Sequence, residues 1–289
     1  MTGIDARGIS ALLSHPIGTR IMIRTSLLAA TLLAVASPAH SQEKPQPAEQ
    51  HAPAGESRIE IRSRPLLSLH MLARAGVAGA EVPECVRAAV EEMRATGNAM
   101  PWGATDGLFA TADDLAAVRD ALVAMSARLP GSAGEHVVAY VDALEEAQPV
   151  FIADVWPDHE ARIKDAQVAL DAALDAHGPA CMAQLCRLLG IADPGAAIPA
   201  YLVADAPSPG GFTALTRAHG PVCIVSIDSH RGSTLVEATL HEAIHALDAR
   251  TREQQPPTVL QALRTALTQA GISSTDTRMR DLPHTLVFA

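Results

Sequence analysis

Aromatic residues are scarce in this sequence: phenylalanine, tyrosine and tryptophan make up 3% of its 289 residues. All-β sandwiches draw on aromatic and β-branched side chains, so this composition disfavours that class. Basic residues are also few, because 22 lysines and arginines stand against 32 acidic residues, for a formal net charge of -10. This balance excludes nucleic acid and an anionic membrane surface as the main partner, since both select for basic patches.

Several catalytic and nucleotide-binding motifs are missing. The chain has no GxSxG nucleophile motif, no P-loop and no glycine-rich dinucleotide fingerprint. It also has no CxxC pair, which disfavours a cysteine zinc cluster. Its four cysteines are Cys85, Cys181, Cys186 and Cys223. Their even number predicts disulfides in an oxidising compartment, with buried free thiols as the alternative.

The N-terminal segment has the pattern of an export signal. From Met22 the chain reads MIRTSLLAATLLAVASPAHSQ, with a basic residue, an apolar run and small residues before Gln42. We expect residues 1–41 to be a signal peptide, with Met22 as the alternative start. Cleavage after Ser41 predicts an exported protein, periplasmic or secreted, without a stable membrane span; an uncleaved anchor is the alternative. Residues 42–56, rich in proline and glutamine, are expected to form a flexible linker.

Two regions follow the linker. Residues 57–196 are predicted to be mainly helical, because apolar residues recur every three to four positions, as in 111–129 with Thr111 as N-cap and in 157–178 with a glycine stop. Residues 197–289 begin with apolar and β-branched runs that predict three short strands, within 197–207, 212–217 and 219–228, before a helix from Ser233. The expected fold class is α+β, helix-rich, with the helical half packed on a small unit that contains a short mixed sheet.

Within the helix that begins at Ser233, the segment TLHEAIHALD places His241 and His245 four residues apart, on one face. Two imidazoles at this spacing suit a zinc ion. Glu242 is turned by about 100° from His241, so it is placed to take a proton from a metal-activated water as general base. The alternative is a helix whose histidines are only hydrogen-bonded.

The segment TLHEAIHAL, with short strands before it, resembles the zincin metallopeptidases. The resemblance implies that His241 and His245 bind zinc, that Glu242 is the general base and that residues 197–289 form a zincin-like catalytic unit. It is gluzincin-like rather than metzincin, because Asp248 and Thr251 stand at the glycine and third-histidine positions of the longer metzincin motif.

The third zinc ligand is not in the motif. Gluzincins take a glutamate from a later helix, commonly at the position that Arg264 occupies here. His284 is therefore the first candidate for a third ligand or an oxyanion stabiliser, and Asp281 is the second. A further segment beyond Ala289 that carries the ligand is the alternative. Asp248 is expected to orient a ligand imidazole, or else to pair with a nearby arginine.

The predicted function is that of an exported zinc-dependent hydrolase, most simply a metallopeptidase, acting on a peptide or a peptide-like cell-envelope amide. The segment PSPGGFTALT is a candidate edge strand for an extended peptide, with a plain hairpin as the alternative. An exported binding or structural protein with an incomplete metal site is the competing function. Asp158, His159 and Glu160 are consecutive, so we expect them to diverge around a helix rather than to bind metal.

Overall fold

The computed structural model describes residues 59–189, 191, 197–216, 220–251 and 269. The chain divides into two units, and all described residues except 269 belong to the unit Ala52–Gln261. The predicted signal peptide and the predicted linker, together with the candidate ligands Asp281 and His284, lie outside the described residues. No helix in the described part of the chain is both long enough and apolar enough to cross a membrane.

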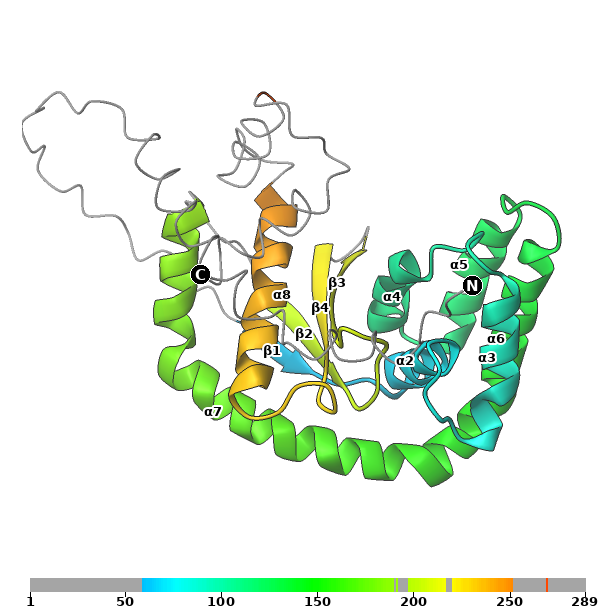
Figure 1. Ribbon diagram of the computed structural model, residues 1–289, viewed down its shortest axis with the longest axis horizontal. Coiled ribbons are helices and arrows are strands. Elements are labelled where there is room, and N and C mark those ends of the chain that lie inside the picture. Colours follow the sequence, from blue (N-terminus) through cyan, green and yellow to red (C-terminus); the bar gives the residue numbers. More distant parts are fainter. Residues whose placement is uncertain (1–58, 190, 192–196, 217–219, 252–268, 270–289) are drawn as a thin grey trace, which may run out of the picture. The chain divides into compact units, whose positions relative to one another are not determined.

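Helices and one small sheet make up the described unit (Figure 1). The elements follow in the order β1 (Ile59–Arg62), α2 (Pro65–Val77), η1 (Glu84–Val86), α3 (Arg87–Ala95), α4 (Trp102–Thr111), α5 (Leu115–Ser126), α6 (Ala133–Val150), η2 (Phe151–Val155), α7 (Trp156–Leu189), β2 (Ile198–Val203), β3 (Gly211–Thr216), β4 (Gly220–Ser226) and α8 (Ser233–Thr251). The predicted α+β, helix-rich class is confirmed.

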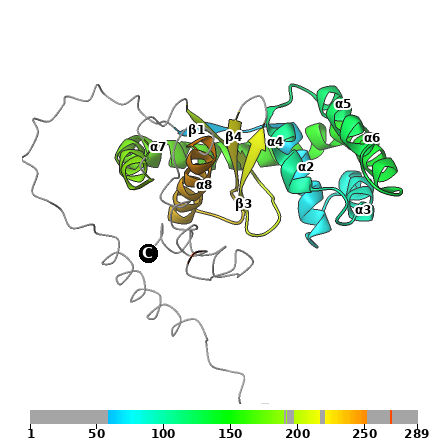
Figure 2. The ribbon, with the colours of Figure 1, turned by 90° about the horizontal axis from the view of Figure 1, so that it is seen from above.

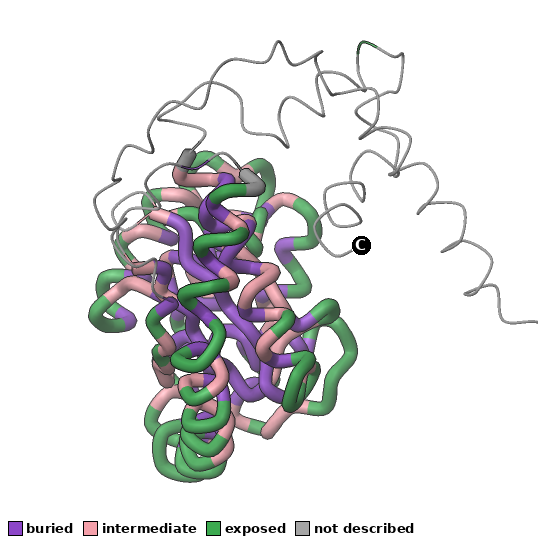
Figure 3. The backbone as a smooth tube through the Cα atoms, turned by 90° about the vertical axis from the view of Figure 1, so that its left-hand side faces the viewer, coloured by how far each residue is buried: buried purple, intermediate pink, exposed green. Residues whose placement is uncertain are grey.

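The sheet is mixed, with the strand order β1-β2-β4-β3. β1 runs parallel to β2 and β2 parallel to β4, whereas β3 is antiparallel to β4. β2 and β4 are buried along most of their length, as expected for central strands covered on both faces (Figure 3). β1 comes from the predicted helical region, so the sheet joins segments from both predicted regions of the chain.

Helices cover both faces of this sheet. In the two views of Figures 1 and 2, α8 lies against one face and α2 with α4 against the other. The contacts of β3 support this arrangement. Thr213 meets Glu242 of α8, whereas the ring of Phe212, the residue before it, lies under Arg74 of α2. Alternate side chains of β3 thus point to opposite helical layers.

One uninterrupted helical run is formed by α6, η2 and α7. The structure corrects two sequence predictions, one within α7 and one at the junction of α4 and α5. The predicted stop at Gly178 is wrong, because α7 continues through Gly178 and Pro179 to Leu189. Leu174 and Met182 are buried on either side of the glycine, so packing outweighs the local stop signal. The predicted N-cap Thr111 is the last residue of α4; Asp114 caps α5 instead, accepting from the N–H of Ala117 at 2.9 Å.

The predicted disulfides are not formed, since all four cysteines are free thiols. Cys181 and Cys186 lie five residues apart within α7, which separates them by about 7.5 Å along the helix axis and points them to different sides. Cys85 lies in η1, and Cys223 lies fully buried in β4. The structure therefore agrees with the alternative prediction, free thiols.

Candidate metal centre

α8 brings its two histidine rings together. The Nε2 atoms of His241 and His245 lie 3.1 Å apart, and the ring planes cross at 70° with their centroids 4.8 Å apart. Both side chains are half-buried. The one-turn spacing of the sequence motif therefore becomes a pair of nitrogens directed at a common point.

This nitrogen spacing fits a zinc ion. Two nitrogens bound at about 2.0–2.1 Å to a tetrahedral zinc lie about 3.3 Å apart, close to the distance between the two Nε2 atoms. The same approach also suits a hydrogen bond between two neutral imidazoles, in which one ring donates and the other accepts. The donor set and its spacing are thus compatible with the metal that the motif predicts.

Glu242 lies on the side of α8 that faces β3. Its side chain is 6% exposed, and the hydroxyl of Thr213 lies 2.7 Å from Oε2 and 2.9 Å from the Glu242 carbonyl oxygen. Burial raises the pKa of the Glu242 carboxyl to about 7, and the hydrogen bond from Thr213 partly opposes this rise. The carboxylate is therefore a desolvated acceptor that one strand residue, Thr213, holds against β3.

Gly211, two residues before Thr213 on β3, leaves room for this carboxylate. A Cβ atom at position 211 would lie 3.1 Å from Oε1 of Glu242, which is tighter than ordinary van der Waals contact. Gly211 and Thr213 share one face of β3 because side chains alternate along a strand. Together they form the strand surface against which Glu242 packs.

If the zinc-dependent hydrolysis predicted from the motif takes place here, Gly211→Ala is expected to lower its kcat about tenfold without loss of zinc, because the new methyl group displaces the Glu242 carboxylate. Gly103→Ala is the matched control, since a Cβ atom there meets no atom within 4 Å. Steady-state kinetics and metal content of both variants check this. Equal kcat in the two variants would show that the carboxylate position tolerates the added atom.

The pairing register determines which backbone groups of β3 face outward. The Gly210 carbonyl accepts from the N–H of Ser226 at 2.7 Å, so these two residues form a hydrogen-bonded pair. Bonded and non-bonded pairs alternate along an antiparallel ladder. The backbone groups of Gly211, Thr213 and Leu215 consequently turn to the outer edge. β3 is the last strand in the order of the described sheet, so this edge lies beside Glu242.

Of the other predicted site residues, Asp248 lies in the described part of the chain. It is 2% exposed and lies on α8 about one turn beyond His245, and its role beside the ligands stays a prediction. Arg250, one of the arginines considered as its partner, donates from Nη2 to the Ala197 carbonyl at 2.9 Å. Asp281 and His284 lie outside the described residues. Within the described residues, no group of three or more histidine, cysteine or acidic side chains is arranged to hold a metal.

The acidic run at the start of α7 diverges as expected. Asp158 and Glu160 are exposed, and Asp158 pairs with Arg162 at 3.4 Å. His159 points inward, with Nε2 3.6 Å from Asp205 Oδ2, and burial lowers the pKa of its imidazole. These three side chains do not converge on one point.

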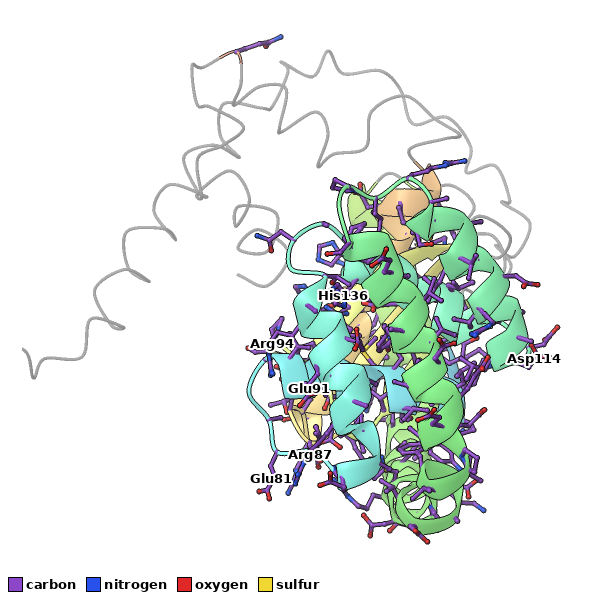
Figure 4. The ribbon with its side chains drawn as sticks, turned by 90° about the vertical axis from the view of Figure 1, so that its right-hand side faces the viewer. Glu81, Arg87, Glu91, Arg94, Asp114 and His136 are labelled. Carbon is purple, nitrogen blue, oxygen red and sulfur yellow. The ribbon has the colours of Figure 1, made fainter. Side chains whose placement is uncertain are left out.

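Two cavities lie away from the histidine pair. One of about 750 Å³ lies between α7 and the start of α8; its polar lining includes Arg162, Asp228 and His230, and it ends at Glu237, one turn before His241. Another of about 280 Å³ lies at α2 and α3, and its charged lining is shown in Figure 4: Glu81, Arg87, Glu91 and Arg94. Neither is lined by His241, Glu242 or His245.

Sequence reasoning missed the contribution of individual β3 residues and a buried polar cluster behind β3. The sequence analysis identified the strand segment but not Thr213 or Gly211 as neighbours of Glu242. No local pattern signals such neighbours, since Thr213 and Glu242 are 29 residues apart in the chain. The cluster is built on His70, whose ring nitrogens meet Tyr140 and Asp106.

Comparisons with protein-family models, with curated proteins and with solved structures found no match to this chain.

Proposed function

We propose that this protein is a zinc-dependent hydrolase of peptide bonds, a zincin-like metallopeptidase, with His241 and His245 as zinc ligands and Glu242 as general base. The observation that carries the proposal is the placement of two converging imidazole nitrogens, 3.1 Å apart, beside a buried carboxylate on one helix. A helix that only needed packing would gain nothing from burying a glutamate at this point, because desolvation of a carboxylate is costly.

The metal role rests on the histidine pair. Zinc bound there would supply a Lewis acid that lowers the pKa of water and polarises a carbonyl group. Both residues are half-buried, and the helix backbone fixes the spacing of their rings. The third ligand is proposed to be His284, with Asp281 as the second choice, as the motif analysis predicts.

Glu242 is proposed to accept a proton from water and return it to the leaving amine. Its position supports this role: it follows His241 directly, and Thr213 orients the carboxylate by donating a hydrogen bond to Oε2. The Gly211 side of the carboxylate has no side chain. A single well-placed donor leaves the second carboxylate oxygen available for a proton.

An extended peptide is the substrate form that the edge strand supports. The backbone N–H and C=O groups of Gly211 and Thr213 face the outer edge of the sheet, while the same two residues meet Glu242 on one face of β3. A peptide paired with this edge would run beside the residues that contact Glu242, and main-chain pairing accepts varied side chains. Together with the predicted export signal, this favours a peptide or a peptide-like cell-envelope amide.

Metal content and hydrolysis of the purified full chain test the proposal. The wild type is expected to hold about one zinc per chain and to cleave unstructured peptides, and His245→Ala is expected to lose both properties. His177→Ala is the matched control, because His177 is an exposed helix histidine on α7. A wild type without zinc, tested after incubation with the metal, would contradict the proposal.

A second function is favoured by one observation: only two metal ligands converge within the described residues. A protein that binds metal through an incomplete set, without turnover, would serve in binding or structure. The two functions differ in one measurement. Zinc uptake combined with no cleavage of any peptide in a degenerate peptide library would select the non-catalytic protein.

A further inference from the structure

A chain of four polar side chains, three of them buried, runs from α6 through α2 to α4. Tyr140 and His70 are 0% exposed and Asp106 is 1% exposed, whereas the Arg74 side chain is partly exposed. The Tyr140 hydroxyl lies 2.7 Å from His70 Nδ1, and His70 Nε2 lies 3.0 Å from Asp106 Oδ1. Arg74 Nη1 donates to Asp106 Oδ2. Phe109 stacks on the His70 ring at 3.8 Å.

The hydrogens of this chain have one consistent arrangement. Burial lowers the pKa of His70 and raises the pKa of Tyr140, so the imidazole is neutral and the phenol keeps its proton. Tyr140 then donates to Nδ1, and Nε2–H donates to the Asp106 carboxylate. The carboxylate charge is matched by Arg74. Each member has a partner, so the chain is rigid and determines the position of the guanidinium group.

The guanidinium group at the end of the chain lies over β3. Arg74 Cζ is 5.4 Å from the centroid of the Phe212 ring, within the range of a cation–π contact. Phe212 stands between Gly211 and Thr213, the two β3 residues that contact Glu242 from the other face of the sheet. His70 and Arg74 are one turn apart on α2, so the same face of this helix carries the buried histidine and the arginine that lies over Phe212.

We infer that the chain Tyr140–His70–Asp106–Arg74 is a positioning device for β3, which holds the segment Gly211–Thr213 against Glu242 through the guanidinium group over Phe212. The inference rests on the proposed function for its catalytic meaning, but its structural content concerns β3 alone. β3 needs such support because it is an edge strand, paired with β4 on one side only in the described sheet. Arg74 and Phe212 are positioning residues and do not contact the reacting atoms.

Amide hydrogen exchange of β3 tests the inference on the full chain. Loss of the guanidinium group in Arg74→Met is expected to speed exchange at the bonded amides of Phe212 and Ala214 about tenfold, because the contact no longer opposes local opening of the strand. Exchange of the central strand β2 is expected to stay unchanged. Arg119→Met is the matched control, since Arg119 pairs with Asp142 on the surface, between α5 and α6.

Arg74→Met also leaves the buried Asp106 carboxylate without its charged partner, with only the hydrogen bond from His70, so a second pair of variants avoids this change. Phe212→Leu removes the ring and leaves the four-residue chain intact; it is expected to give the same local increase. Phe212→Tyr keeps the ring and is expected to restore slow exchange. For the zinc-loaded protein, kcat for peptide cleavage is expected to fall about tenfold in Phe212→Leu and to recover in Phe212→Tyr.

Unchanged β3 exchange in both Arg74→Met and Phe212→Leu would overturn the inference. An equal increase in β2 and β3 would also overturn it, because it reports global destabilisation rather than a local role. The exchange measurement requires neither zinc nor turnover. If the wild type binds no zinc, the proposed function is wrong. The exchange measurement still tests whether the four-residue chain positions β3.

Discussion

Glu242→Gln is expected to lower kcat for peptide hydrolysis by about a thousandfold while leaving the zinc content unchanged. Glutamine has the shape of glutamate, and its carbonyl oxygen still accepts the hydrogen bond that Thr213 donates to Oε2 in the wild type. What the amide loses is the ability to accept a proton from water. The two proposed ligands, His241 and His245, are untouched. Steady-state kinetics on an unstructured peptide, with metal content measured on the same sample, check both parts.

The matched control for this substitution is Glu237→Gln. Glu237 is an exposed glutamate on α8, one turn before His241, so it carries the same change of charge on the same helix. Its kcat is expected to stay close to the wild-type value. Retention of more than about a tenth of wild-type kcat in Glu242→Gln would rule out the general-base role, since loss of a positioned base costs at least about a hundredfold. Loss of zinc in that variant would instead make Glu242 part of the metal site.

The sheet was largely predictable because its strands carry their signal locally. β2 and β4 are runs of apolar and β-branched residues, and β3 follows a turn marked by proline and glycine. α4 escaped prediction because its sequence, WGATDGLFAT, contains two glycines and lacks an apolar stripe; it is held by burial of Phe109 and Ala110 instead. Tertiary packing there outweighs local propensity.

The residues of the site also fall into those that the sequence predicts and those that it does not. His241, Glu242 and His245 lie within one helical turn, so their spacing alone predicts which side chains meet. The partners of Glu242 and the chain behind β3 were not predictable, because their members are far apart in sequence: His70 lies 70 residues from Tyr140 and 36 from Asp106. A polar residue with a partner at such a separation looks, in sequence, like any other helix residue.

Metal-free Glu242→Gln is expected to gain stability relative to the metal-free wild type as pH rises. The folded-state pKa of Glu242 is raised to about 7, whereas glutamate in an unfolded chain titrates near about 4.3. Between these values the folded protein holds a proton that the unfolded chain has lost. The stability that this group contributes is therefore present below the unfolded pKa and is lost as pH rises through about 7. Glutamine does not titrate, so the difference in unfolding free energy should change by about 2.5 kcal/mol between about pH 5 and about pH 8.

Urea unfolding of the two proteins in the presence of a chelator, repeated across this pH range, measures that difference. His241 and His245 are common to both proteins, so any contribution from them cancels to first order in the comparison. Glu237→Gln again supplies the control, because its side chain is exposed in the folded state. If the Glu242→Gln difference is independent of pH, the carboxylate is hydrated in the folded protein and the burial that supports its role as a base is absent. If the difference in unfolding free energy grows with pH as expected, the Glu242 side chain destabilises the metal-free fold at neutral pH. Such a loss of stability is expected where catalysis, rather than packing, determines the residue.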